Sequence, residues 1–180
     1  MRALPVAAFD REWRKIHDSV FLDRHADERP FRNDAWEAVL VPYALNMEED
    51  VFTAIGTAAR PKGDDELVIW NAEVLTPEPG AIIPWSYTSL NEVRCSILGH
   101  FETHLFGRSG SWGVVCSVVQ FSWVGGDATL MDSFARALGG RDAVRKRFLD
   151  YARDIWTVPE ASRSHILQSV GWRMTNGFVH

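Results

Sequence analysis

Two histidines four positions apart are the first residues in this sequence that could bind a metal. His100 and His104 enclose Phe-Glu-Thr, and on a helix this spacing places both imidazoles on one face. Zinc proteases use the spacing in the motif HExxH, but Glu102 stands one position too late to match it. The sequence shows no third ligand nearby. We therefore expect an exposed histidine pair, and neither a metal site nor a cofactor.

Nucleophilic and phosphate-binding motifs also lack the spacing that their chemistry requires. Ser109 and Ser111 lie in a glycine-rich turn, residues 107–113, without the GxSxG pattern of a nucleophilic serine or the GxxxxGK[ST] pattern of a phosphate loop. Cys116 lies in an apolar run, where cysteine usually behaves as a small hydrophobic residue. We therefore predict no catalytic residue and a protein without enzymatic activity.

Length and composition indicate one globular unit. The chain has 180 residues, 46% hydrophobic and 24% charged, so residues 1–180 can bury a sizeable core as a single domain. The two cysteines have neither a disulfide pattern nor a zinc-binding spacing. Charges interrupt the N-terminus before a signal-peptide core develops, and no window approaches the roughly 18 apolar residues of a membrane span. We expect a cytoplasmic protein without membrane contact.

The negative charge is concentrated in the first half of the chain. Residues 1–90 contain 9 Lys and Arg against 16 Asp and Glu, whereas residues 91–180 contain 10 against 8. An acidic surface repels nucleic acid and attracts a basic protein. The charge distribution therefore excludes nucleic acid as the favoured partner and indicates a protein with a basic surface.

Two acidic clusters could form a rim around exposed aromatic side chains. Residues 48–50 precede a predicted helix and residues 64–66 precede a predicted strand that contains a tryptophan. A helix dipole and a solvated turn explain the same charges without any function. The functional alternative is a surface that covers a basic partner, because tryptophan is enriched among interface anchors. The predicted partner-binding residues are Glu48, Glu49, Asp50, Asp64, Asp65, Glu66 and Trp70.

Hydrophobic spacing predicts helices that alternate with short strands. Apolar residues three or four apart indicate helices from Asp10 to about Asp27, from Asn46 to Ala59, from Ser89 to Leu105, from Asp127 to Leu138, from Arg141 to Trp156, and after Pro159. Runs rich in β-branched and aromatic residues indicate strands at 36–45, 66–75, 112–119 and 121–124, the last two as a hairpin. The pattern predicts an α/β (α+β) single domain with a small mixed or antiparallel sheet flanked by several helices.

The stretch SGSWGVVCS, followed by a hydrophobic strand that ends in Gly-Gly and by a helix, resembles the C-terminal half of bacterial immunity proteins. These proteins neutralise polymorphic toxins and toxins of contact-dependent inhibition. The resemblance covers residues 105–155 and departs from the family at 118–120, where many members carry His or Glu-Asp and this chain has Val-Val-Gln. It implies a small cytoplasmic α/β protein that blocks a cognate toxin by binding it.

We therefore expect a non-enzymatic, immunity-type protein that binds a toxin domain stoichiometrically. Two alternatives stay open at this point. One is a small enzyme of unknown reaction, with a pocket near the Pro-rich loop at residues 76–84. The other is a regulatory or structural subunit. The sequence does not indicate the toxin or the oligomeric state.

Overall fold

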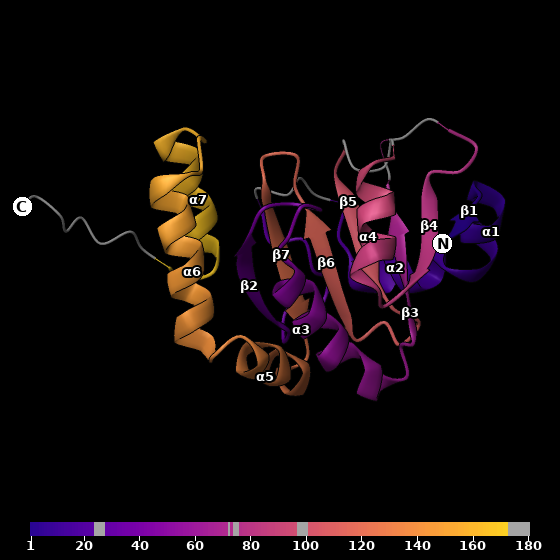
Figure 1. Cartoon of the computed structure of the whole chain (residues 1–180), viewed down its shortest axis with the longest axis horizontal. Coiled ribbons are helices and arrows are strands. Elements are labelled where there is room, and N and C mark those ends of the chain that lie inside the picture. Colours follow the sequence, from indigo (N-terminus) through magenta and orange to yellow (C-terminus); the bar gives the residue numbers. More distant parts are fainter. Residues whose placement is uncertain (24–27, 72, 74–75, 97–100, 173–180) are drawn as a thin grey trace, which may run out of the picture.

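We describe a computed structural model of the chain, in residues 1–23, 28–71, 73, 76–96 and 101–172. These residues form a single-domain α+β fold around one seven-stranded sheet with the order β1-β4-β3-β5-β6-β7-β2, in which all neighbours pair antiparallel (Figure 1). The predicted fold class is confirmed, and the sheet is antiparallel. No helix in these ranges combines the length and the apolar character needed to cross a membrane.

The strands are short and the helices lie between them in the chain. The strands are β1 (Arg2–Leu4), β2 (Glu37–Pro42), β3 (Glu66–Trp70), β4 (Gly80–Pro84), β5 (Thr103–Phe106), β6 (Trp112–Cys116) and β7 (Phe121–Gly126). The helices are α1 (Val6–Glu12), α2 (Arg14–Val20), α3 (Glu49–Ala59), α4 (Tyr87–Arg94), α5 (Ala128–Ala137), α6 (Arg141–Asp154) and α7 (Glu160–Ser169), with a short 3-10 helix at Arg60–Lys62.

Helices cover both faces of the sheet, so the fold has two hydrophobic cores. Helices α3, α4 and α5 pack on one face, while α1, α2 and α7 pack on the other. Side chains alternate between the two cores along each central strand, as pleating requires: Val114 faces the first core and Val115 the second. Helix α6 contributes to both, with Val144 in the first core and Phe148 in the second.

The uncharged segment from Ser111 to Asp127 is the β6–β7 hairpin, whose two strands are buried throughout. Gly113 and Gly125 pair across the two strands. A Cβ on Gly113 would lie 2.8 Å from the ring of Phe21, and one on Gly125 would lie 2.3 Å from the ring of Phe31. The glycine pair therefore makes a shallow site in the sheet that these two rings fill, and the segment is a structural element at the centre of the fold.

Two predicted helices end earlier than the spacing suggested. The helix predicted from Ser89 to Leu105 ends at Arg94, and Leu105 lies in β5 between β3 and β6. Backbone pairing with two neighbouring strands outweighs the helical spacing there. The helix predicted to reach Asp27 ends at Val20, because Phe21 forms an isolated bridge with Phe31, and residues 24–27 lie outside the described ranges.

Two smaller expectations were also wrong. The Pro-rich segment predicted as a loop contains β4, which pairs with both β1 and β3. The helix predicted to continue to Trp156 ends at Asp154, and Ile155 is exposed. Ala152 is the last buried residue of this helix.

Asp64, which the sequence placed at an acidic rim, is a buried hydrogen-bond acceptor. Its carboxylate accepts hydrogen bonds from the Ser109 backbone N–H at 2.8 Å, the Ser109 hydroxyl at 2.5 Å and the Trp112 indole at 2.7 Å. Its backbone carbonyl accepts a fourth, from the Trp85 indole at 2.7 Å. One aspartate thus joins the start of β3 to the loop before β6 and to the segment after β4.

The Asp64→Ala substitution should lower the free energy of unfolding by about 3 kcal/mol, because three donors would lose a charged acceptor inside the protein. Its exposed neighbour supplies the control, and Asp65→Ala should change the stability by less than about 0.5 kcal/mol. Urea denaturation of both variants, followed by tryptophan fluorescence, measures the difference. Equal stabilities would show that the Asp64 carboxylate does not hold these segments together.

Candidate functional site

The structure places the second predicted acidic cluster largely away from any rim. Asp64 and Trp70 are interior residues, at 2% and 6% exposure, and Trp70 stacks on Phe9 with ring centroids 3.5 Å apart. Asp65 and Glu66 are exposed, and Glu66 lies 3.8 Å from Arg2. The expected surface tryptophan is therefore a core residue, because its indole fills the space between α1 and the sheet.

The first predicted cluster surrounds a cation from another helix. Arg147 of α6 forms an ion pair with Glu48 and a bidentate one with Asp50, at 2.7 and 2.9 Å. Glu49 is exposed. The 11 residues of α3 separate the two clusters by about 16 Å at 1.5 Å per residue. The clusters therefore do not form one continuous acidic surface.

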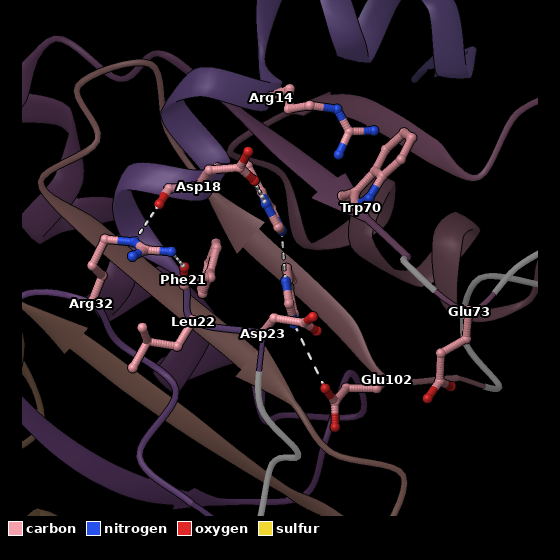
Figure 2. Close-up of a pocket in the computed structure, with 11 residues that line it drawn as sticks. Arg14, Asp18, Phe21, Leu22, Asp23, Arg32, Trp70, Glu73 and Glu102 are labelled. Carbon is pink, nitrogen blue, oxygen red and sulfur yellow. Dashed lines mark hydrogen bonds and ion pairs between the residues drawn. The ribbon is translucent and has the colours of Figure 1, made fainter.

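A pocket of about 600 Å³ lies instead on the opposite face, under α2. Trp70 and His104 pair across β3 and β5 at its floor, and Glu73 and Glu102 lie just beyond these strand ends. Figure 2 shows how α2 and the segment that follows it supply the remaining polar groups. The lining consists of Arg14, His17, Asp18, Phe21, Leu22, Asp23, Arg32, Trp70, Glu73, Glu102 and His104.

Two histidines from distant parts of the chain meet in this pocket. Nε2 of His17 lies 2.8 Å from Nδ1 of His104, and the two rings stack with centroids 5.1 Å apart. Nδ1 of His17 lies 3.0 Å from Oδ1 of Asp18, while Nε2 of His104 lies 3.7 Å from Oε1 of Glu102. Figure 2 shows this chain of contacts between Asp18 and Glu102.

The carboxylate of Asp18 determines where the protons of this chain lie. A carboxylate only accepts, so Nδ1 of His17 must carry the proton, and its Nε2 then holds a lone pair. The short contact between the rings requires Nδ1–H of His104 to donate to that lone pair. The remaining nitrogen of His104, Nε2, is consequently the one that faces Glu102 and the pocket.

Burial keeps His17 neutral near pH 7. Loss of solvation lowers its pKa from 6.5 to about 4, and the hydrogen bond to Asp18 opposes this effect only in part. A neutral His17 is the form that can accept from His104. The pocket therefore contains a hydrogen-bonded histidine pair in which the inner ring stays uncharged.

The charges that line the pocket are mostly unneutralised carboxylates. Arg14 donates to Asp10, outside the pocket, whereas Arg32 donates to the backbone carbonyl of Asp18 at 2.6 Å and keeps its positive charge in the lining. The carboxylates of Asp18, Asp23, Glu73 and Glu102 outnumber these two guanidiniums. Among the described residues, no Lys or Arg lies within ion-pair distance of Asp23, Glu73 or Glu102. The pocket is thus suited to a cationic group.

The structure gives the other candidate chemical residues structural positions. His104 lies in β5, so it does not form a helical pair with His100, which falls outside the described ranges. Burial raises the pKa of Cys116 to about 12, so this thiol is a poor nucleophile. Ser109 is bound to Asp64. In the described part of the chain, no group of three or more His, Cys, Asp or Glu is placed to hold a metal ion.

Sequence reasoning missed the pocket although one signal was present. His17 follows Trp13 by four residues and precedes Val20 by three, so it lies on the apolar side of the predicted helix. A histidine in that position needs a polar partner in the interior. The partner, His104, was assigned to a helix, and this wrong assignment hid the contact. The pocket is lined by none of residues 76–84, the segment proposed for an enzyme's pocket.

Comparisons with protein-family models, with curated proteins and with solved structures found no match for this chain.

Acidification should destabilise the protein through His17. Its pKa is about 4 in the folded chain and 6.5 when the ring is fully solvated, so the unfolded chain binds more protons between these values. The stabilising effect is complete above pH 6.5 and is lost as the pH falls to about 4, with a magnitude of about 3 kcal/mol. Urea unfolding across this range should show a smaller pH slope for His17→Gln than for the unmodified protein. Identical slopes would contradict a neutral, buried His17.

Proposed function

We propose that this chain is an immunity-type protein of the cytoplasm that binds a cognate toxin domain one to one and blocks it without enzymatic activity. The observation that carries the proposal is the set of three pocket carboxylates, Asp23, Glu73 and Glu102, with no Lys or Arg of the described chain within ion-pair distance. The neighbour of Glu102 is a histidine, with Nε2 of His104 at 3.7 Å. Unpaired carboxylates at a concave surface favour the approach of a basic partner and raise its association rate.

A basic toxin surface fits this pocket for a second reason. The half-buried side chain of Leu22 stands beside the carboxylates, and the buried rings of Phe21 and Trp70 lie beneath it. Interfaces combine such apolar contacts with a few fixed polar groups. Long basic side chains suit a lining of this kind, because their alkyl stems contact apolar groups while their heads reach the carboxylates.

We keep the exposed members of the predicted rim as candidates for a separate contact region. They are Glu49, Asp65 and Glu66. None of the three lines the pocket. Glu49 begins α3 on one side of the sheet, whereas Glu66 follows the same alternation along β3 as Val68 and Trp70 and so lies on the same face as the pocket, near Arg2. The same binding assay can therefore test the pocket and these residues separately.

Charge reversal in the pocket should weaken toxin binding. The assay is co-purification and calorimetric titration with a toxin domain, for which the variable C-terminal domain of a secreted protein encoded by a neighbouring gene is the candidate. Glu73→Lys should reduce the affinity at least about tenfold, and the loss should shrink at high salt because screening weakens both attraction and repulsion. Glu73 is exposed, so the substitution should leave the thermal stability unchanged.

The control variants are Glu49→Lys and Asp65→Lys, which introduce the same charge change at exposed residues outside the pocket. Each should alter the affinity by less than about twofold. A loss confined to these two variants would move the contact region away from the pocket. A toxin domain that binds none of the proteins would overturn the immunity function itself.

A further inference from the structure

A hollow of about 490 Å³ lies between the tip of the β6–β7 hairpin and residues 155–159, which join α6 to α7. We call it the tip hollow. Apolar side chains are exposed on both of its walls: Val118 and Val119 at the hairpin tip, at 55% and 41%, and Ile155 on the opposite wall, at 55%. These are three of the six large hydrophobic side chains that are exposed in the described part of the chain, so half of them meet at one place.

The hairpin tip departs from the residue preferences of a turn. Residues 117–120 form a β-turn that is closed by a hydrogen bond from the Gln120 N–H to the Ser117 carbonyl at 3.1 Å. Central turn positions favour Gly, Asn, Asp, Ser and Pro, but Val118 and Val119 occupy them here. Gln120 has a φ of 70°, in the region that favours glycine. A local sequence that conflicts with its local structure is expected at functional sites.

A second residue with positive φ lines the same hollow. Tyr43 follows β2 with a φ of 59°, and within the described ranges only Tyr43 and Gln120 have positive φ without being glycine. Such conformations cost free energy and persist where the surroundings fix them. The Tyr43 carbonyl accepts from the Ser122 hydroxyl at 3.1 Å, and the Gln120 carbonyl accepts from the Tyr151 hydroxyl at 2.6 Å. Both strained residues are therefore held in place by hydrogen bonds.

The two walls of the tip hollow are joined to each other from the inside. The buried indole of Trp156 donates from Nε1 to the Val119 carbonyl at 2.7 Å, and the Tyr151 side chain is buried beside it. The exposed valines thus stand on a fixed backbone, and a preorganised surface loses less conformational entropy when it binds. Burial raises the pKa of Tyr151 to about 12, and none of the described lining residues is Asp, Glu, Lys, Arg or His. The tip hollow is therefore uncharged at neutral pH.

The tip hollow opens at the same end of the sheet as the pocket under α2, which we call the acidic pocket. Cys116 at the end of β6 pairs with Thr103 at the start of β5, so the hairpin tip and Glu102 leave the sheet at one end (Figure 1). Phe101, a fourth exposed hydrophobic side chain, precedes Glu102 there. Strands β5 and β7 are two strand spacings apart, about 10 Å. A protein domain that covers the acidic pocket is therefore wide enough to reach the tip hollow.

We propose that the tip hollow is a second contact site for the partner of the acidic pocket, and that it takes one apolar side chain, aromatic or branched aliphatic, from an uncharged part of the partner beside its basic surface. An uncharged, apolar lining favours such a group over a charged one. The inference rests on the proposed function for the identity of the partner. A second copy of this chain is disfavoured as the occupant, because contact at this end would bring two acidic pockets together.

The first test is calorimetric titration of the full chain with the toxin-domain candidate. Val119→Asn and Ile155→Asn each remove an apolar side chain from one wall without changing the charge. Each should weaken binding about fivefold, and the loss should not shrink at high salt because it is not electrostatic. Asparagine is favoured in turns, so Val119→Asn should not lower the urea midpoint.

Val6→Asn is the matched control, because Val6 is 40% exposed and follows β1 at the other edge of the sheet. It should change the affinity by less than about twofold. Toxin binding that falls with Glu73→Lys but not with Val119→Asn would overturn the tip hollow as a contact site and leave the immunity function standing.

A small uncharged probe tests the tip hollow without any toxin. In an NMR titration of the ¹⁵N-labelled full chain, N-acetyl-leucine amide should shift the backbone N–H signals of residues 118–120 and 157–158 with a Kd on the order of 10 mM. Its polar isostere, N-acetyl-asparagine amide, should bind at least about fivefold more weakly. Equal binding of the two probes, or shifts confined to other residues, would overturn the apolar site. Leucine-probe binding here without any toxin binding would support the site and overturn the immunity function.

Sedimentation velocity tests the alternative occupant. We expect the unmodified chain to sediment as a monomer at every concentration. A dimer that Val119→Asn dissociates and Val6→Asn leaves intact would assign the tip hollow to a second copy of the chain and would overturn the proposal.

Discussion

The site depends on how closely helix α2 approaches the sheet. Gly113 of β6 carries no side chain where Val20 and Phe21 press on the sheet, and a Cβ there would lie 2.7 Å from a methyl group of Val20. A larger residue would hold the end of α2 away from the strands. His17 lies one turn earlier on this helix, so the same contact brings its ring to within hydrogen-bond distance of His104. A packing constraint in the core thereby determines a polar geometry at the surface.

The histidine pair tolerates this burial because the inner ring, His17, stays neutral. His17 exchanges its hydration for two hydrogen bonds and stays neutral, at a pKa of about 4. His104 receives aromatic contact from Phe21 and keeps one nitrogen towards the pocket. Two cationic imidazoles in contact would repel each other and would both place a donor at the shared position. The pair is stable only when its hydrogen bonds run in one order along Asp18, His17 and His104. Asp18 therefore influences His104 although the two side chains do not touch.

The sequence predicted the parts of the fold that local spacing controls and missed those that long-range pairing controls. The β6–β7 hairpin and the helix that begins at Asp127 follow from local patterns, and the structure confirms both, with Asp127 as the N-cap of α5. Strand β5 does not follow from a local pattern, because its apolar residues also fit a helix. Only its pairing with β3 and β6 excludes the helix. Asp64 and Trp70 were wrongly predicted at the surface for a related reason, because their partners are distant in the sequence. Asp64 accepts hydrogen bonds from Ser109 and Trp112. Trp70 stacks on Phe9.

Hydrogen-bond acceptors predominate among the polar groups of the pocket. Its carboxylates and its histidine nitrogen are acceptors, and its two guanidiniums are already bound to acceptors of the chain itself. The acceptors of such a site attract an N–H donor. This property would serve the proposed binding of a basic partner. The neutral inner ring of His17 then has a physical role, since it orders the acceptor without adding a competing positive charge.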